Sequence, residues 1–356
     1  MDGAATGAGG ETVALASAGD DRSPAPSGYS AARFAGRRAA VRARLSAAPS
    51  WLGVSIALAL LVAVLSIKTD LFLTGVNLRN LLEGMSATLV VAIGTTLLIA
   101  LGIADLSVGA LMALSMMVLA GLMHGTLPVA VVLVATVAFA SAVSALTTGV
   151  LVAWVRLNFF VVTLGALAAF QAAAQLPTQG ATVSIADRHG FSTVEWIGSG
   201  TLLGLPTAPL IALAVVVFGG LLLNRTTFGQ AARAIGGNET AARLAGIPVT
   251  RVKLLIFGLN GVAIGLAAVM FAGRSYSADP TIGASLALDV IAAVVLGGSS
   301  FIGGQATVVG TLLGVLFIAV LQNGLNLLGV SDLWQGVVTG IVLIVAVWFD
   351  RLRGTS

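Results

Sequence analysis

Long apolar stretches separated by short polar segments dominate the sequence from residue 51 onward. Several of them approach the ~20 residues that an α-helix needs to cross the hydrocarbon core of a bilayer. Two, 209–223 and 286–298, are shorter, and we expect them to be re-entrant or extended by neutral flanking residues. The pattern predicts an all-α polytopic membrane protein with about ten transmembrane helices, at 51–67, 84–103, 106–123, 128–155, 159–176, 209–223, 254–272, 286–298, 306–323 and 334–349.

Composition agrees with this class. Hydrophobic residues make up 58% of the chain and charged residues 9%, against about 25% charged residues in soluble domains. The mean hydropathy is +1.04. The net charge of +4 does not indicate nucleic acid as a partner, because the basic residues lie at the ends of apolar stretches, where membrane topology explains them. The chain has no cysteine, which excludes disulfides, thiolate metal sites and a cysteine nucleophile.

Residues 1–50 are rich in Gly, Ala, Ser and Pro, and they end in a basic cluster. They are too long and too polar for a signal peptide. We expect a disordered cytoplasmic N-terminal tail with a basic juxtamembrane patch that contacts anionic lipid. Residues 51–356 then form the transmembrane domain. The basic cluster consists of Arg33, Arg37, Arg38, Arg42 and Arg44.

Charge counting predicts the topology. If all ten stretches cross and the N-terminus is cytoplasmic, only four of the 18 Lys and Arg residues lie outside, namely Lys68, Arg79, Arg188 and Arg274. This asymmetry favours ten spans with both termini in the cytoplasm. Spans 2–5 and 7–10 would then form two inverted four-helix blocks with a pathway between them, although their residue-level similarity is weak. The outside loop 177–207 is expected to form a small external cap or docking surface.

A polar island, residues 224–253, lies between the sixth and seventh stretches and carries five basic residues. Asn238 can N-cap a short helix, and Glu239 suits its N-terminal end. Gly246 and Pro248 end this helix. The helix would present a small-residue surface for a partner, although a structured linker is an equally good interpretation. The surface consists of Ala241, Ala242 and Ala245, bounded by Gly237 and Gly246.

Polar residues inside apolar stretches are candidates for a solute pathway. Asp105, in GIADLSVGA, favours a cap on the following helix over a place in a discontinuous pathway helix. Asp289 is the other acid among apolar residues, and a pathway contact and a structural role are equally compatible with it. Gln322, Asn323 and Asn326 lie on neighbouring helical turns. They could bind a hydroxyl-rich solute or link helices, which is the commoner use of such amides.

Motifs of catalysis and nucleotide binding are absent from the sequence. It contains no HExxH, no GxSxG and no Gly-Lys-Ser/Thr, so it has no Walker A sequence. The glycine-rich segment Gly297 to Gly304 therefore favours a close-packing turn over a phosphate cradle. The chain has no enzyme site of its own.

Four segments together resemble the permease subunits of ribose/xylose/arabinose-type ABC importers, and the likeness runs from about Asn77 to Asp350. They are GIADLSVGA, FGQAARAIGGNETAARLAGI, LDVIAAVVLGGSSFIGGQATVVGTLLG and QNGLNLLGVSDLWQ. The island resembles the EAA-x3-G coupling loop, except that Thr240 stands in the place of the Glu. The resemblance implies a permease that works as a dimer in the plasma (inner) membrane. It also implies ATP on a cytoplasmic partner subunit, no cofactor on this chain, and an extracytoplasmic sugar-binding protein.

The sequence thus predicts a permease that moves a monosaccharide or related polyol by alternating access. The alternative is a secondary transporter driven by H⁺ or Na⁺. That mechanism requires several ionisable residues in the middle of the membrane. Only Asp105 and Asp289 approach this requirement, and both lie near predicted span ends, which disfavours the alternative.

Overall fold

All ten apolar stretches form helices in the computed structural model, which describes residues 51–354. Five of the helices are long and apolar enough to cross a membrane, and five more are shorter apolar helices. The expected all-α polytopic membrane fold is confirmed. The disordered N-terminal tail and its basic patch, predicted for residues 1–50, lie outside the described residues. The long spans are Gly75–Ala100, Val129–Ala153, Thr207–Arg225, Val249–Ser275 and Val308–Leu327.

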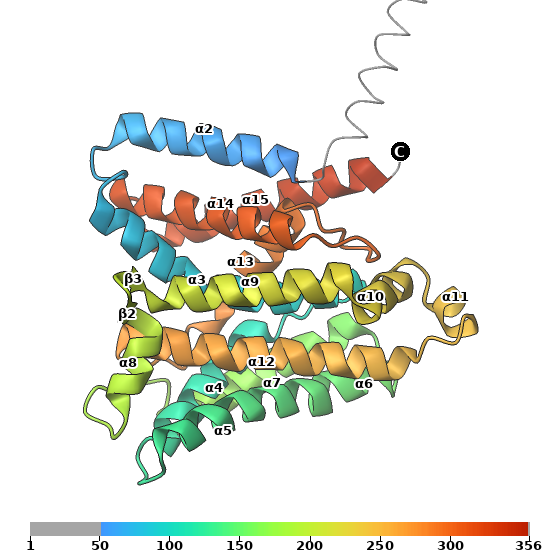
Figure 1. Ribbon diagram of the computed structural model, residues 1–356, viewed down its shortest axis with the longest axis horizontal. Helices are drawn as coiled ribbons and strands as arrows, with labels where there is room; N and C mark the ends of the chain where they lie inside the picture. Colours follow the sequence, from blue (N-terminus) through green and yellow to red (C-terminus); the bar gives the residue numbers. More distant parts are fainter. Residues whose placement is uncertain (1–50, 355–356) are drawn as a thin grey trace, which may run out of the picture. The chain divides into compact units, whose positions relative to one another are not determined.

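The first part of the chain, up to the outer loop, is made of membrane helices (Figure 1). One of them changes locally from α- to π-helical geometry, so that α5, η1 and α6 continue one another. The elements are α2 (Leu52–Lys68), α3 (Gly75–Ala100), α4 (Val108–Leu122), α5 (Val129–Val143), η1 (Ser144–Gly149), α6 (Val150–Ala153) and α7 (Phe159–Gln175).

The outer loop expected to form a cap contains a short helix and small strands, β1 (Val183–Ser184), α8 (Phe191–Ser199), β2 (Thr201–Leu202) and β3 (Leu205–Pro206). β1 pairs antiparallel with β4 (Ser277–Ala278), and β2 pairs with β3. The chain then continues through α9 (Thr207–Arg225), α10 (Thr227–Gly237), α11 (Glu239–Leu244), α12 (Val249–Ser275), α13 (Gly283–Leu296), α14 (Val308–Leu327) and α15 (Asp332–Gly354).

Two sets of helices repeat the same arrangement in opposite directions. α3 and α12 lie side by side at the centre and run antiparallel (Figure 1). α14 packs on α3 as α5 packs on α12, and α13 packs on α3 as α4 packs on α12. The pairs α4–α7 and α13–α15 correspond in the same way. The contacts therefore support the inverted four-helix blocks that the topology predicted.

A short motif carries this repeat in the sequence. Residues 104–110 read ADLSVGA and residues 278–284 read ADPTIGA, at the same position before α4 and α13. In the first copy, Asp105 Oδ1 accepts hydrogen bonds from the backbone N and the Oγ of Ser107, at 2.8 and 2.6 Å. In the second copy, Asp279 Oδ1 accepts the same pair from Thr281, at 2.8 and 2.7 Å. Each aspartate thus closes a tight turn just before its helix, and the N-cap residues of α4 and α13, Ser107 and Ile282, make no side-chain cap hydrogen bond.

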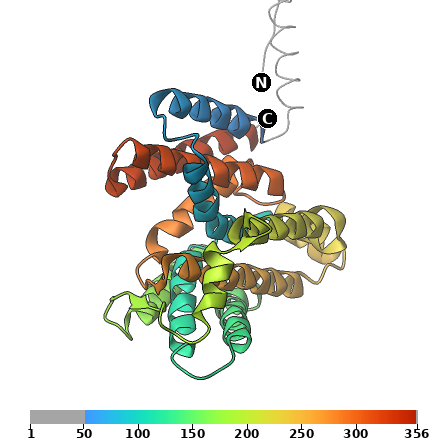
Figure 2. The same ribbon diagram turned by 60° about the vertical axis from the view of Figure 1, so that its left-hand side comes forward.

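The connecting elements separate to opposite ends of the described unit. α8, β2 and β3 lie at one end, which Figure 2 turns toward the viewer, and α10 and α11 lie at the other (Figures 1 and 2). The C-terminal end of α15 lies at the same end as α10 and α11. We call these the α8 end and the α11 end. Their separation is the one expected if loops 177–207 and 224–253 face opposite sides of a membrane.

α3 begins nearer the N-terminus than the apolar pattern indicated. The apolar stretch starts at residue 84, whereas the helix starts at Gly75, where the Thr74 side chain accepts a hydrogen bond from the Asn77 backbone N. The first turns carry Asn77, Arg79, Asn80 and Glu83, whose polarity hid them from a hydropathy pattern. These turns border both pockets described below.

Candidate functional site

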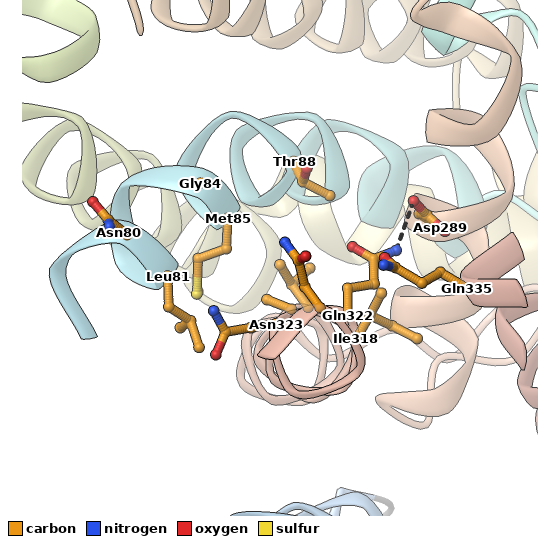
Figure 3. A pocket seen from close by; sticks show the side chains of 13 residues that line it. Asn80, Leu81, Gly84, Met85, Thr88, Asp289, Ile318, Gln322, Asn323 and Gln335 are labelled. Atoms are coloured by element: carbon orange, nitrogen blue, oxygen red, sulfur yellow. Dashed lines mark hydrogen bonds between the residues drawn. The ribbon is translucent and has the colours of Figure 1, made fainter. Parts of the chain in front are cut away.

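A polar pocket of about 290 Å³ lies between α3 and α14, with Asp289 of α13 and Gln335 of α15 at one side (Figure 3). Small-molecule pockets usually occupy roughly 300–1,000 Å³, so this one suits a small ligand. On α3 it is lined by residues at helical spacing, among them Asn80, Gly84 and Thr88. No Lys or Arg occurs among the described residues that line it. We call it the α3–α14 pocket.

α14 supplies three amide side chains to the α3–α14 pocket, Gln322, Asn323 and Asn326. Asn323 and Asn77 of α3 exchange two hydrogen bonds, at 2.9 and 3.0 Å between the amide atoms. This pair links two helices, which is the structural use the sequence left open; such contacts in membrane proteins contribute about 0.6 kcal/mol on average. Within residues 51–354 the side-chain amide of Asn326 has no hydrogen-bond partner, so this amide can meet a ligand.

Asp289 provides the carboxylate of the pocket. It is half-buried on α13, and Gln322 Nε2 donates a hydrogen bond to its Oδ2 at 3.1 Å (Figure 3). The structure therefore brings together four of the five candidates that the sequence offered for a solute pathway: Asp289, Gln322, Asn323 and Asn326. Their role in transport stays a prediction. Carboxylate and amide groups around one cavity can accept hydrogen bonds from, and donate them to, a hydroxyl-rich molecule.

The equivalent position in the other block is filled. α12 and α5 correspond to α3 and α14, and they meet through glycines, since a Cβ built at Gly265 would lie 2.7 Å from the Val137 Cα. Ser144 Oγ donates to the Phe257 carbonyl at 2.8 Å, and Ser141 Oγ donates to the Gly258 carbonyl at 3.0 Å. The α3–α14 pocket therefore breaks the repeat. Departures from internal regularity are expected at functional sites.

Asp105, the remaining candidate, does not line this pocket. Its side chain is buried, and besides the turn that its Oδ1 makes with Ser107, its Oδ2 is 3.5 Å from the Nδ2 of Asn260 on α12. These contacts form a tight turn before α4, but neither Asp105 nor Ser107 makes a side-chain cap hydrogen bond to the helix, so the capping role that the sequence favoured is wrong. The same segment, 101–107, is also non-helical between α3 and α4, so the helix is discontinuous as the second interpretation required.

The polar island folds into two short helices. Asn238 caps α11 as predicted, because its Oδ1 accepts a hydrogen bond from the Ala241 backbone N at 2.9 Å. α10 was not anticipated, although Phe228, Ala231, Ala232 and Ile235 recur at the spacing of one helical face. Buried Ala232 and Ile235 now hold this face against the membrane helices.

Glu239 ties α11 to the first turns of α12. Its two carboxylate oxygens pair with Arg243 at 2.8 Å and with Lys253 at 2.6 Å. Partial burial by itself would raise the pKa of Glu239, but the hydrogen bonds and charges of Lys253 and Arg243 outweigh burial and bring this pKa below its ordinary value. The carboxylate is thus ionised at neutral pH. This role was not foreseen, because Glu239 stands one residue before the family's Glu position.

The exposed surface of α11 differs from the one expected. Ala242 is buried at 5% exposure, so its assignment to a free docking face is wrong. Its carbonyl accepts a hydrogen bond from the Ile247 backbone N, which folds the chain back over it. Ala241, Ala245 and Gly246 are exposed as expected, and beside them Leu244 is 85% exposed. The sequence did not indicate Leu244 as a contact residue, because the small residues around it are the ones that match a coupling-loop surface.

The C-terminal end of α10 makes a close backbone contact through Gly236. Gly237, its neighbour, has no heavy atom near its Cβ position. A Cβ at Gly236 would lie 2.5 Å from the Gly304 backbone N, which donates to the Ala100 carbonyl at 3.1 Å. The segment Gly297 to Gly304 therefore acts as the close-packing turn that the sequence favoured. It joins the end of α3 to the end of α10.

Comparisons with known proteins agree on one family. Residues 77–347 match the family model described as branched-chain amino acid transport system / permease component. The ribose import permease protein RbsC of Bacillus subtilis is 41% identical over 304 residues, which cover 85% of this chain and 93% of that protein. RbsC of Escherichia coli K12 is 38% identical over 298 residues, 84% of this chain and 92% of that protein.

A relative with a different printed substrate is nearly as similar. The L-arabinose ABC transporter permease protein AraH of Azospirillum brasilense is 37% identical over 303 residues, 85% of this chain and 87% of that protein. No solved structure matches the chain.

Proposed function

Because this chain belongs to the permease family that its residues 77–347 match, we propose that it forms the solute pathway of an ATP-driven sugar importer for a pentose or a similarly hydroxylated monosaccharide. The chain itself is not an enzyme, and ATP hydrolysis belongs to a separate subunit. The observation that carries the proposed substrate class is the amide and carboxylate lining of the α3–α14 pocket.

The family description mentions branched-chain amino acids, but the pocket favours a sugar. A zwitterionic amino acid needs a cationic partner for its carboxylate and an apolar site for its side chain. Neither Lys nor Arg is among the described lining residues, whereas Asn80, Gln322 and Asn326 are. Neutral amides that both donate and accept suit the alternating donors and acceptors of a polyol. The relatives' printed substrates, ribose and arabinose, agree with this choice.

Transport by alternating access gives the inverted blocks a role. The α3–α14 pair leaves a cavity, whereas the equivalent α12–α5 pair is closed around Gly261 and Gly265. Transporters built from inverted repeats expose a central site first to one side and then to the other as one block moves against the other. We place Asp289, Asn323 and Asn326 on the part of the pathway open in this structure.

The α11 end is the proposed contact with the ATP-binding subunit. Exposed Leu244, flanked by Ala241 and Ala245, forms an apolar surface on a helix that the Glu239–Lys253 ion pair fixes to α12. Gly246 ends this helix with a positive φ of 83° and stays exposed. A rigid helix held this way can pass a movement of the partner to α12, which runs through the centre of the fold.

The remaining assignments follow from the family and the charge distribution. They are a plasma-membrane location, cytoplasmic termini, a second permease copy and an extracytoplasmic sugar-binding protein. The natural lack of cysteine makes topology testable by single cysteines. Gly237→Cys should react with a membrane-impermeant thiol reagent only after the membrane is opened, and His189→Cys should react in intact cells. Labelling in the reverse order would overturn the orientation.

Uptake by cells tests the substrate class. Cells that lack their own pentose permeases would receive this chain together with its ATP-binding subunit and its extracytoplasmic binding protein. Labelled ribose, arabinose, xylose and leucine would then be compared. Uptake of at least one pentose, and none of leucine, is expected. Leucine uptake without pentose uptake would refute the proposed substrate class.

A further inference from the structure

A second cavity of about 390 Å³ lies at the α8 end, between the first turns of α3, the last turns of α12 and the end of α8. We call it the outer pocket. Its floor includes Glu83, whose side chain is only 8% exposed, and its walls include Arg274, Ser199 and Ser275. Tyr276 and Phe271 add two aromatic rings. None of these residues belongs to the proposed pathway in the α3–α14 pocket or to the α11 surface.

The chemistry of the outer pocket suits a hydroxylated solute. Glu83 uses Oε1 to accept a hydrogen bond from Arg79 at 2.7 Å, and among the described residues this is its hydrogen-bond partner, so acceptor capacity remains. Arg274 offers a fork of donors, of which one bonds the Asn80 carbonyl at a long 3.5 Å. A carboxylate and a guanidinium that line one cavity can hold hydroxyl groups of a ligand as acceptor and donor respectively. Charged groups such as the Glu83 carboxylate and the Arg274 guanidinium would be costly on a surface that faces lipid.

The outer pocket adjoins the α3–α14 pocket. Asn80 lines both, and the Arg274 guanidinium comes within 3.6 Å of the Cβ position of Gly84, which also lines the α3–α14 pocket. A glycine at this point leaves room for the arginine to lie against α3. Arg274 therefore lies at the boundary between the outer pocket and the α3–α14 pocket. Removal of its head group would change the polar lining at this junction.

Tyr276 connects the outer pocket to the cap formed by α8. Its hydroxyl donates a hydrogen bond to Glu195 Oε1 at 2.6 Å, and its ring lies 5.2 Å from that of Phe191. Its backbone has a positive φ of 58°, which is costly for an aromatic residue. Strain at a residue that also lines a cavity is typical of a functional position. The contacts with Glu195 and Phe191 are what hold it there.

We propose that the outer pocket is a first binding site for the same hydroxylated solute, which Glu83 and Arg274 hold before it passes Asn80 and Gly84 into the α3–α14 pocket. This inference rests on the proposed function, because it takes the solute to be a monosaccharide. It adds a site with its own residues and a direction of movement from the α8 end. The strained Tyr276 closes this site against the cap.

Graded blocking of the outer pocket tests the proposal. Ser275→Cys in the otherwise cysteine-free chain would be assembled with its partner subunits and treated with methanethiosulfonates of increasing size. Thr201→Cys, exposed at the same end but not lining the pocket, is the matched control. Uptake should fall stepwise with reagent size at position 275 and stay level at 201. ATP hydrolysis stimulated by the binding protein should be retained in both.

Arg274→Gln provides a second test without any reagent. Loss of a hydrogen bond from a charged donor lowers the affinity for the solute by roughly tenfold or more. Uptake at low sugar concentration should therefore fall about tenfold, while stimulated ATP hydrolysis persists. Uptake independent of reagent size at 275 would overturn the proposal. Loss of stimulated ATP hydrolysis along with uptake would also overturn it, and would assign the pocket to contact with the binding protein. Absence of sugar uptake in the unmodified complex would instead refute the proposed function.

Discussion

Gly109 at the start of α4 and Gly283 at the start of α13 touch through their backbones, and they occupy the same position in the two inverted blocks. A Cβ built at Gly283 would lie 2.6 Å from the carbonyl carbon and oxygen of Gly109. Contact between equivalent residues means that the axis relating the blocks passes close to them. The two short helices thus start beside each other, where any side chain would force the blocks apart.

Replacement of Gly109 by alanine should therefore destabilise the fold. Overpacking of a tight contact costs about 1–3 kcal/mol, and here the obstacle is backbone. Gly121→Ala on the same helix is the matched control, because nothing lies within 4 Å of its Cβ position. Thermal unfolding of the purified protein in detergent should show a lower midpoint for Gly109→Ala only. Equal midpoints for the two variants would show that the blocks are not in contact there.

The helices of this fold are readable from the sequence, whereas the repeat that relates the two blocks is not. The ten helices and their alternating directions could be predicted, because hydropathy and basic residues at span ends follow directly from the cost of placing charge in hydrocarbon. The inverted repeat of the two four-helix blocks has only weak similarity at the level of residues. Its signal is confined to the turns ADLSVGA and ADPTIGA, because lipid-facing positions between them can exchange one apolar residue for another freely.

Leu244 is predicted to carry the contact with the ATP-binding subunit. Leu244→Asp should leave the chain folded, since the side chain is 85% exposed, but it should place a charge in the proposed apolar contact. Sugar-stimulated ATP hydrolysis and uptake by the assembled complex should fall by roughly tenfold or more. Leu203→Asp, 97% exposed at the other end of the unit, should leave ATP hydrolysis unchanged. Full activity of Leu244→Asp would remove α11 from the interface.

Asp289 is predicted to contact the transported sugar. Asp289→Asn can keep a hydrogen bond with Gln322 but loses the charged acceptor, which is worth roughly a tenfold change in rate. Uptake by the assembled complex should fall by about that factor with normal membrane insertion. Leu288→Val, on an exposed neighbour that does not line the pocket, is the control. Parental uptake by Asp289→Leu would make the residue an ordinary interfacial acid.

The ion pairs of Glu239 predict a pH dependence of α11. Because the folded-state pKa is lowered, the stabilisation is present above the ordinary value of 4.5 and is lost as pH falls through the folded-state pKa. Pairs this exposed contribute at most about 1 kcal/mol each. Amide hydrogen exchange of residues 239–247, corrected for intrinsic rates, should be faster in Glu239→Gln than in the parent at pH 7. The difference should vanish once the pH is below the lowered folded-state pKa of Glu239.

An exposed acid at the opposite end of the unit controls for a general charge effect. Asp187→Asn changes the net charge by the same amount and should leave exchange of residues 239–247 unchanged at either pH. Equal protection of this segment in Glu239→Gln and the parent at pH 7 would mean that the ion pairs do not anchor α11.

The candidate sites could be predicted only in part, for a geometrical reason. Asp289, Asn323 and Asn326 were nominated because polar side chains are costly in an apolar stretch, and they converge on one pocket. Glu83 and Arg274 were not nominated, because each lies at a span end where charge is ordinary. Ala242 was placed on the wrong face, since six residues of helix do not define which side the following loop will cover.

The measurement that tests the central claim most directly is sugar uptake by liposomes containing this chain. Liposomes would hold the chain with or without its ATP-binding subunit, with binding protein and labelled pentose outside. ATP inside, or an imposed H⁺ or Na⁺ gradient, would supply the energy. We predict uptake only when both the ATP-binding subunit and ATP are present, with no effect of either gradient. Pentose uptake driven by an ion gradient in liposomes that contain this chain alone would contradict the account.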